Sequence, residues 1–326
     1  MKMLSRTTRR FSAASSPRFS EVLTVKKKIL AGLLSLSLLG GAVTADAARY
    51  FMQGDAKGVK TPYGDNVKIG QYVQTKDAKI YYEVYGKGEP ILILHGGGVG
   101  SPYELGRIID GLKKNHKVIV MSTRGHGRSE IGHTPLTYAQ KANDALAVLN
   151  AASDGAVQIL GFSDGAYTAY EIAALYPERV ERIVAIGAGT LEAGFFSGEM
   201  KVDDLAKIDA AFVEYEKTIM PEPERWQEFC TNYMKFWSKM SVGEETFGAI
   251  ECPVLLIVGD EDDHAPVSTV LAAHQLIPNS RLCVVPKAWH SAFLDNFDVT
   301  WAAVSQFMNA DLKTLTPSKK LPQNSR

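Results

Sequence analysis

The chain has 326 residues, of which 45% are hydrophobic and 22% charged, a composition typical of a globular protein with a sizeable core. The formal net charge is zero, but the first 47 residues carry eight Lys or Arg against two acidic residues, which leaves 28 basic and 34 acidic residues in the rest of the chain. Nucleic-acid binding requires a basic face, so this balance argues against it. We expect no nucleic-acid partner.

Residues 1–47 are interpreted as an N-terminal extension that contains a signal peptide. Three lysines precede an apolar stretch from Ile29 to Val43, and Ala45-Asp46-Ala47 then provides a cleavage site of the A-x-A type. The apolar stretch is short for a membrane span. We therefore expect export to a periplasm or to the outside of the cell, with a membrane-anchored protein as the alternative.

Two other interpretations of this segment stay open. Signal peptides normally begin close to their lysines, so residues 1–24 suggest that translation starts near Val25. Four arginines that lie among serines in the same stretch are typical of a mitochondrial transit peptide. Export is favoured because the lysines, the apolar stretch and the cleavage site follow in the right order, and no stable membrane insertion is expected after cleavage.

The three cysteines, Cys230, Cys252 and Cys283, cannot form a fully paired disulfide framework. Cys252 and Cys283 lie on or beside expected strands and could approach one another, but buried free thiols are the more ordinary interpretation. None of the three takes part in a spacing typical of metal ligands. We expect neither a metal nor a cofactor.

Alternating strand and helix patterns follow the N-terminal segment. After a polar, Gly-containing stretch over residues 48–67, expected to be a flexible leader, two short strands at 69–74 and 79–85 are separated by a Lys-Asp turn. Further apolar, β-branched runs of strand length occupy residues 91–94, 117–121, 157–160, 180–186, 254–258 and 281–285. Helical periodicity covers 138–151 and 166–175. The pattern predicts an α/β fold, a doubly wound and mostly parallel sheet with an antiparallel N-terminal hairpin.

One stretch breaks the alternation of strands and helices. Residues 190–249 contain no good strand, but aromatic residues recur there at helical spacing. We interpret this stretch as a small helical cap on a single catalytic domain that spans residues 68–310. Residues 311–326 are then a C-terminal tail.

The segment LGFSDGAYTAY, residues 160–170, places Ser163 between two glycines where a strand gives way to a helix. A tight strand-to-helix turn strains its central residue, so the flanking residues must be small, as Gly161 and Gly165 are. Such a turn raises the Ser163 hydroxyl above the carboxyl edge of the strands, where doubly wound folds bind ligands. We predict that Ser163 is a nucleophile.

A serine hydroxyl needs a base, and the base needs an acid to orient it. His290 follows the last expected strand, which places it at the same edge as Ser163. Four carboxylates follow the strand at 254–258, of which Asp262 is the first choice and Asp260 the second. The chain order Ser, Asp, His is the one expected of this architecture.

Two backbone N–H groups are expected to bind the oxyanion that forms on the substrate. The N–H of Asp164 comes directly after the nucleophile. The second comes from the LHGGG segment after an earlier strand, where we choose Gly97 with Gly98 as the alternative, since glycines allow close backbone approach. His95 is expected to orient this loop.

With LHGGG, TRGHGRS, GFSDG, GDED and WH in this order, residues 68–309 resemble the α/β-hydrolase family. One departure is the segment Met121-Ser122-Thr123, since relatives often have an acid just before TRG. SDG at the turn and the following ALYPERVERIVAIGAG are similar to the valacyclovir hydrolase (biphenyl hydrolase-like) branch. That resemblance implies an esterase for α-amino-acid esters in which Asp164 meets the substrate ammonium. The alternative is that Asp164 only bonds neighbouring backbone or the cap.

The sequence thus predicts a serine hydrolase that cleaves small carboxylic esters through an acyl-enzyme formed on Ser163. Amide cleavage, hydrolysis of a C–C bond and cofactor-free peroxidation by the same three residues are alternatives, because one fold serves many chemistries. A non-catalytic binding protein is the alternative of a different class. The oligomeric state is left open.

Overall fold

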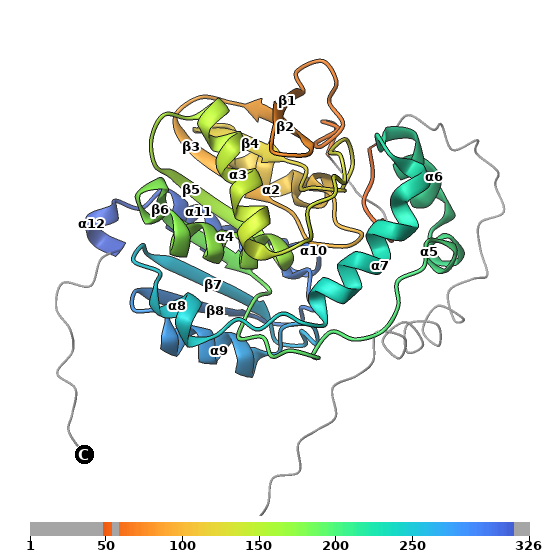
Figure 1. Cartoon of the computed structure of the whole chain (residues 1–326). Coiled ribbons are helices and arrows are strands. Elements are labelled where there is room, and N and C mark those ends of the chain that lie inside the picture. Colours follow the sequence, from red (N-terminus) through yellow and green to blue (C-terminus); the bar gives the residue numbers. More distant parts are fainter. Residues whose placement is uncertain (1–47, 54–58, 316–326) are drawn as a thin grey trace, which may run out of the picture.

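The computed structural model describes residues 48–53 and 59–315, so the expected signal peptide lies outside the described residues. Its centre is an eight-stranded sheet with the order β1-β2-β4-β3-β5-β6-β7-β8 (Figure 1). The strands are β1 (Gln71–Gln74), β2 (Lys79–Tyr85), β3 (Glu89–Leu94), β4 (His116–Met121), β5 (Val157–Phe162), β6 (Val180–Ile186), β7 (Val254–Gly259) and β8 (Ser280–Val285).

Strands β3 to β8 run parallel, whereas β1 and β2 form an antiparallel edge beside β4. The predicted α/β fold class, with its antiparallel N-terminal hairpin, is confirmed. All eight strands lie within two residues of their predicted limits, because continuous apolar runs are what strands buried on both faces require. Since parallel strands end at one edge, the loops after β3, β5, β7 and β8 come together there.

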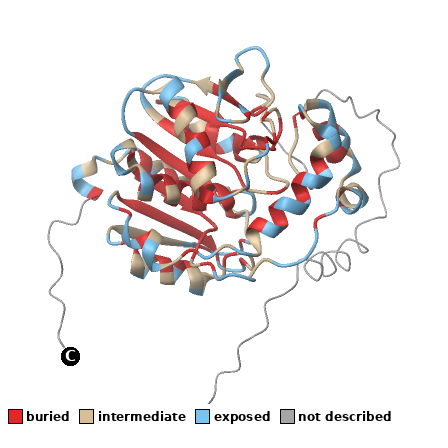
Figure 2. Ribbon diagram, in the orientation of Figure 1, coloured by how far each residue is buried: buried red, intermediate tan, exposed pale blue. Residues whose placement is uncertain are grey.

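Helices cover both faces of the sheet, whose strands are largely buried (Figure 2). The sheet separates two clusters of core residues, one on each face. One face is covered by α3 (Tyr138–Ala152), α4 (Asp164–Leu175) and α9 (Val267–Leu276), and the other by α2 (Gly106–Leu112) and α11 (Phe297–Met308). Alternate residues of one strand serve the two clusters. Leu92 and Leu94 of β3 belong to the first cluster, and Ile91 and Ile93 belong to the second.

The expected helical cap is shorter than predicted. Helices α5 (Val202–Ile208), α6 (Ala210–Ile219) and α7 (Trp226–Trp237) gather at one end of the molecule (Figure 1). Helix α8 (Glu244–Gly248) lies elsewhere, against α4 and α9. The range 190–249 therefore joins cap helices to a helix of the main body. Phe247, which is fully buried, explains the position of α8 because its ring packs on Tyr170 of α4.

The segment 48–67, expected to be a flexible leader, makes specific contacts in its described part. The Tyr63 side chain is buried and its hydroxyl donates to Asp110 of α2. The Phe51 ring packs edge-on against Phe212 of α6, and the Met52 N–H donates to Asp209 just before that helix. The described part of this segment therefore packs on the domain through its aromatic side chains, and its flexibility stays a prediction.

Shorter elements complete the described chain, and one of them bears on the predicted tail. The 3-10 helices are η1 (Pro102–Leu105), η2 (Pro177–Arg179) and η3 (Pro223–Arg225), and the remaining helices are α10 (Ala292–Asp295) and α12 (Leu312–Leu315). Helix α12 opens the predicted tail at 311–326, and Leu315 is buried in the core of the domain. Residues 311–315 are thus part of the domain, and the rest of the predicted tail, 316–326, lies outside the described residues.

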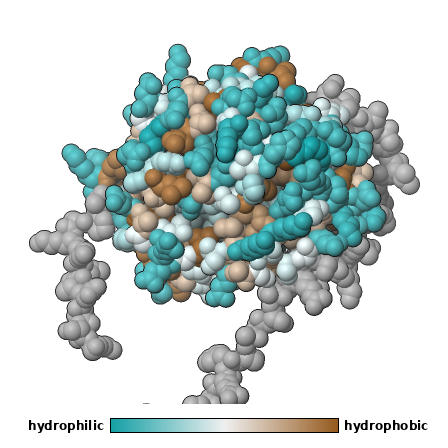
Figure 3. Space-filling view, viewed as in Figure 1, coloured by the Kyte–Doolittle hydropathy of each residue, from teal (hydrophilic) through white to brown (hydrophobic). Residues whose placement is uncertain are grey.

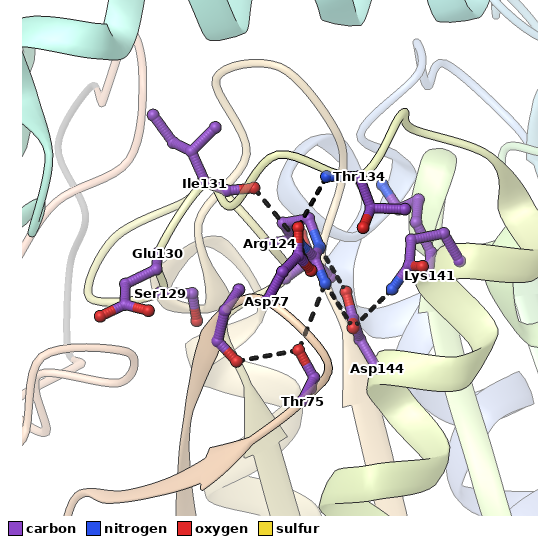
Figure 4. A network of polar contacts seen from close by, with 12 residues as sticks. Thr75, Asp77, Arg124, Ser129, Glu130, Ile131, Thr134, Lys141 and Asp144 are labelled. Atoms are coloured by element: carbon purple, nitrogen blue, oxygen red, sulfur yellow. Dashed lines mark hydrogen bonds and ion pairs between the residues drawn. The ribbon is translucent and has the colours of Figure 1, made fainter.

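A buried arginine fixes the loop that follows β4. The Arg124 guanidinium donates to Asp144 of α3 and to Asp77 in the turn between β1 and β2 (Figure 4). It also reaches the hydroxyl of Thr75. Two carboxylates around one guanidinium provide the compensation that a buried charge needs. Three separate segments are thereby held at the point from which the TRGHGRS loop passes under the cap.

Hydrophilic residues cover most of the face seen in Figure 3, with hydrophobic residues scattered singly among them. This is the ordinary surface of a folded domain. Within residues 48–53 and 59–315, no helix combines the length and the hydrophobicity needed to span a bilayer.

Candidate active site

Ser163 occupies a strained turn between β5 and α4. Its φ is +51°, a region that residues with a Cβ seldom adopt, and its N–H donates to the Ile186 carbonyl. A Cβ on Gly161 would lie 2.5 Å from the Gly165 carbonyl oxygen, and one on Gly165 would lie 2.4 Å from the Leu94 carbonyl oxygen. Both glycines are therefore required for helix α4 to start this close to the sheet.

The structure brings Ser163, His290 and Asp262 together. His290 Nε2 lies 2.9 Å from Ser163 Oγ, and His290 Nδ1 lies 3.0 and 2.9 Å from the two carboxylate oxygens of Asp262. The Asp262 side chain is fully buried and the His290 side chain is 18% exposed. An acceptor on Nδ1 keeps the proton on that nitrogen, so Nε2 is free to accept the serine proton.

Backbone groups hold Asp262 in this position. Its Oδ1 accepts hydrogen bonds from the N–H groups of His264 and Ala265, at 2.9 and 2.8 Å. Asp260, the second choice, accepts from the Ala288 N–H instead and makes no contact with His290. The turn after β7 thus selects between the two carboxylates by geometry.

The loop after β3 forms the wall opposite His290. His95 is buried, its Nδ1 lies 2.6 Å from the Gly96 carbonyl, and its Nε2 accepts the Thr123 N–H. Burial lowers the pKa of His95 to about 4, which suits a neutral imidazole that donates from one nitrogen and accepts on the other. His95 therefore ties this loop to the loop after β4, the orienting position expected for it.

Gly97 lies closer to the expected oxyanion position than Gly98 does. A Cβ on Gly97 would lie 2.8 Å from the Cβ of Asp164, and among the described residues neither the Gly97 nor the Asp164 N–H has a hydrogen-bond acceptor. The N–H of Gly98 instead faces the hydroxyl of Tyr233. The Gly97 and Asp164 N–H groups are the two that this arrangement leaves for an oxyanion.

The Asp164 carboxylate does not fit the expected role of binding a substrate ammonium. It is buried, forms an ion pair with Lys141 of α3, and accepts hydrogen bonds from the Tyr233 hydroxyl and the Trp237 indole of α7. Burial alone would raise the pKa of Asp164, but Lys141 and these donors lower it below its usual value. Its charge is already compensated, so we correct the expectation: Asp164 bonds the cap, which was the alternative.

A cavity of about 210 Å³ opens beside Ser163. Ser163, His290 and the oxyanion loop line it together with side chains from the cap, from the main body and from the segment before β1. These further residues include Phe51, Glu104, Tyr138, Phe162, Tyr167, Phe196, Met200, Trp237 and His264. The aromatic residues of α7 occupy two different environments. Trp237 faces the cavity, whereas Phe229, Tyr233 and Phe236 are buried in the packing beneath the cap.

Two residues that the sequence analysis did not select shape the position of His290. A Cβ on Gly187 would lie 2.9 Å from His290 Cε1, and the φ of Gly187 is +65°. The ring of His264 stacks on that of His290 with centroids 4.8 Å apart. A glycine directly after a strand was the one visible signal for the first, whereas nothing distinguished His264 from a surface residue.

Asp262, His264 and His290 are also the one group among the described residues with the proximity of metal ligands, their atoms lying within 4.8 Å of one another. Asp262 and His290 already satisfy each other, and His290 faces Ser163. A metal would have to displace these bonds. The absence of a metal in the working site stays a prediction.

A family described as the α/β-hydrolase fold matches residues 89–216, which include β3, the oxyanion loop, Ser163 and the first cap helices. Together with the sheet order and the turn at Ser163, this match defines the class. The chain has the α/β-hydrolase fold.

Curated relatives span nearly the whole described domain. The 2-hydroxy-6-oxo-6-(2'-aminophenyl)hexa-2,4-dienoic acid hydrolase of Metapseudomonas resinovorans is 24% identical over 279 residues, covering 77% of this chain and 92% of that protein. The human serine hydrolase BPHL is 24% identical over 260 residues, covering 74% and 87%. A crystal structure of a serine hydrolase involved in carbazole degradation has a TM-score of 0.63 at 22% identity, covering 74% and 98%, and supports the fold.

Proposed function

We propose that the protein is a serine hydrolase that cleaves carboxylic esters through an acyl-enzyme on Ser163. The observation that carries the proposal is the chain of contacts from Ser163 Oγ to His290 Nε2, at 2.9 Å, and from His290 Nδ1 to Asp262. These distances are those at which a base removes the proton of a serine hydroxyl.

The reaction follows from this geometry. Ser163 Oγ attacks the ester carbonyl carbon while its proton passes to His290 Nε2, and the resulting imidazolium is stabilised by Asp262. The Gly97 and Asp164 N–H groups receive the negative charge that forms on the carbonyl oxygen. His290 then gives the proton to the departing alcohol. A water molecule, deprotonated by His290 in turn, releases the acid from Ser163.

Ester cleavage is favoured over the main alternative by the charge of the cavity. The relative from Metapseudomonas resinovorans is named for a dienoic acid that contains no ester or amide, so its hydrolysis breaks a C–C bond. A substrate of that kind carries a carboxylate and needs a cation to receive it. No Lys or Arg is among the described residues that line the cavity, and the nearby Lys141 is paired with Asp164.

The test is a panel of short-chain esters, amides and vinylogous 1,5-diketones offered to the purified protein and to Ser163→Ala. We expect ester hydrolysis by the wild type and a kcat about 10⁴- to 10⁶-fold lower in the variant. Ser268→Ala, an exposed serine on α9, is the matched control and should keep full activity.

Two outcomes would contradict the proposal. Ester turnover that survives in Ser163→Ala would remove the nucleophile from its role. A wild-type protein that no fluorophosphonate labels at Ser163 would instead support a non-catalytic binding protein. Activity confined to amides or to C–C bonds would keep the mechanism and change the substrate.

We also propose that the protein is exported after cleavage near Ala47, on the support of the lysines, apolar stretch and A-x-A site of residues 1–47. N-terminal sequencing of the expressed protein tests this. A mature chain that starts at or near Ala48 is expected, and an intact segment before Val25 would contradict both export by this signal and the later translation start.

A further inference from the structure

The cavity contains one carboxyl group that no cation compensates among the described residues. Glu104 lies on η1, where its Oε1 accepts the Gly96 N–H at 2.9 Å. The residue is partly exposed, yet desolvation raises the pKa of its carboxyl group to about 8 despite hydrogen bonds from the Gly96 and Ser101 N–H groups. No described Lys, Arg or His lies within ion-pair distance of it.

Glu104 differs in this respect from Asp164, the other acid that lines the cavity. The charge of Asp164 is balanced by Lys141 and by two further donors from α7. Glu104 receives only uncharged backbone donors. A buried carboxylate without a counter-charge is costly, so an organic cation in the cavity would be attracted to Glu104 and not to Asp164.

The rest of the lining suits a cation of organic character. Six aromatic side chains face the cavity: Phe51, Tyr138, Phe162, Tyr167, Phe196 and Trp237. The faces of such rings attract ammonium groups, and quaternary ammonium ligands are commonly bound between rings and a carboxylate. The aromatic lining accepts apolar groups and attracts cations weakly, so the carboxylate is the stronger determinant of charge preference.

We propose that Glu104 recognises a positively charged ammonium substituent on the substrate, so that the protein prefers esters with an organic cation. The cation binds within the aromatic lining while the ester carbonyl lies at Ser163. This proposal rests on the proposed esterase function only in so far as it names the substrate an ester. The recognition of an ammonium group by Glu104 can be measured without turnover.

The simpler interpretation is that Glu104 only positions the oxyanion loop through Gly96. The variant Glu104→Gln separates the two roles, because the glutamine oxygen can still accept the Gly96 N–H while the negative charge is gone. A positioning role predicts equal effects on charged and neutral ligands. A recognition role predicts an effect on charged ligands alone.

The probes are choline and 3,3-dimethyl-1-butanol, which have the same shape and differ by one positive charge. Their dissociation constants are measured by calorimetry at pH 8.5 on the full chain carrying Ser163→Ala, with and without Glu104→Gln. We expect choline to bind the Glu104 protein at least about tenfold more tightly than the neutral alcohol, and this preference to fall about tenfold with Glu104→Gln, since attraction between opposite charges a few ångströms apart in a partly buried site is worth that factor or more.

Glu89→Gln is the matched control, because Glu89 is an exposed glutamate at the opposite end of β3. It should leave the preference for choline unchanged. A preference that is undiminished in Glu104→Gln, or the absence of any preference in the Glu104 protein, would overturn the inference. Neither result bears on whether Ser163 hydrolyses neutral esters, so the two proposals fail separately.

The same pair of probes is then converted to substrates. The ratio of kcat/KM for butyrylcholine to that for 3,3-dimethylbutyl butyrate is compared at pH 8.5 between the wild type and Glu104→Gln, which cancels the intrinsic reactivity of each ester. We expect the ratio to fall about tenfold in the variant. An unchanged ratio would contradict recognition of the cation in the reaction.

Discussion

The ion pair between Lys141 and Asp164 provides the sharpest test of the electrostatics of this site. Both side chains are almost completely buried, 2% and 1% exposed, and three helices meet at the Asp164 carboxylate: α3 through Lys141, α4 through Asp164 itself and α7 through Tyr233 and Trp237. The variant Lys141→Met keeps the length and apolar character of the side chain but removes its charge.

Removing one partner of a buried pair leaves an uncompensated charge, which costs about 3–5 kcal/mol of unfolding free energy. Two neutral donors, from Tyr233 and Trp237, remain on Asp164 and place the expected value towards the lower end of that range. Lys217→Met is the control, because Lys217 forms only an exposed ion pair with Glu214 on α6 and should leave the unfolding midpoint close to that of the wild type.

The pH dependence of the unfolding free energy of Lys141→Met distinguishes an uncompensated buried charge from lost packing. In the wild type the pKa of Asp164 is lowered, so its contribution to stability is present above the usual carboxyl pKa and is lost as the pH falls through the lowered value. Without Lys141, burial becomes the dominant influence and raises the pKa. Stability of the variant should then decline as the pH rises above the usual carboxyl pKa.

Urea unfolding of the wild type and Lys141→Met at pH 5 and pH 8 measures this difference, and the deficit should be larger at pH 8. The double variant Lys141→Met/Asp164→Asn removes the stranded charge and should recover much of the loss at pH 8. A deficit under about 1 kcal/mol at pH 8 would refute a buried, charged Asp164. An equal deficit at both pH values would attribute the loss to packing.

Two further predictions concern the catalytic geometry. Asp262→Asn should lower kcat by about 10⁴-fold in steady-state assays, because the imidazole of His290 loses the acceptor that sets its tautomer. The control Asp260→Asn alters only a hydrogen bond from the Ala288 N–H and should change kcat by no more than a few-fold. Equal losses of kcat in the two variants would contradict the assignment of Asp262. Gly187→Ala should lower kcat by about 100-fold, because the added methyl group would lie 2.9 Å from His290 Cε1 and displace the ring. The circular dichroism spectrum should match that of the wild type. Full activity of the variant would show that catalysis tolerates a shift of His290.

The sheet and the triad were accessible from the sequence for the same reason. Strands of a sheet buried on both faces are written as continuous apolar runs, and side chains directly after such runs lie at one edge. Ser163, Asp262 and His290 each follow a strand in this way. The choice of Asp262 over Asp260 also follows from how far a side chain lies beyond the last residue of β7.

The features that the sequence did not reveal depend on contacts between side chains that are far apart in the sequence. Lys141 belongs to a helical pattern in which a lysine ordinarily faces solvent, and only the packing of α3 on α4 places it beside Asp164. Glu104 lies in a short 3-10 helix without periodicity. The packing of Phe51 on the cap was hidden by polar neighbours, because composition reports the average of a segment and not its few buried residues.

The position of Tyr233 has a consequence for how new specificities arise on this scaffold. Its hydroxyl contacts Lys141, Asp164 and the backbone N–H of Gly98, so α7 is part of the polar network beside the active site that it covers. A chimaera that carries a foreign cap on this body, without replacing Asp164 by an uncharged residue, would contain a buried charge that has lost two of its three side-chain partners. Substrate range is therefore more readily altered by exchanging single cavity residues such as Phe196 or Met200, which are uncharged and do not compensate a buried charge.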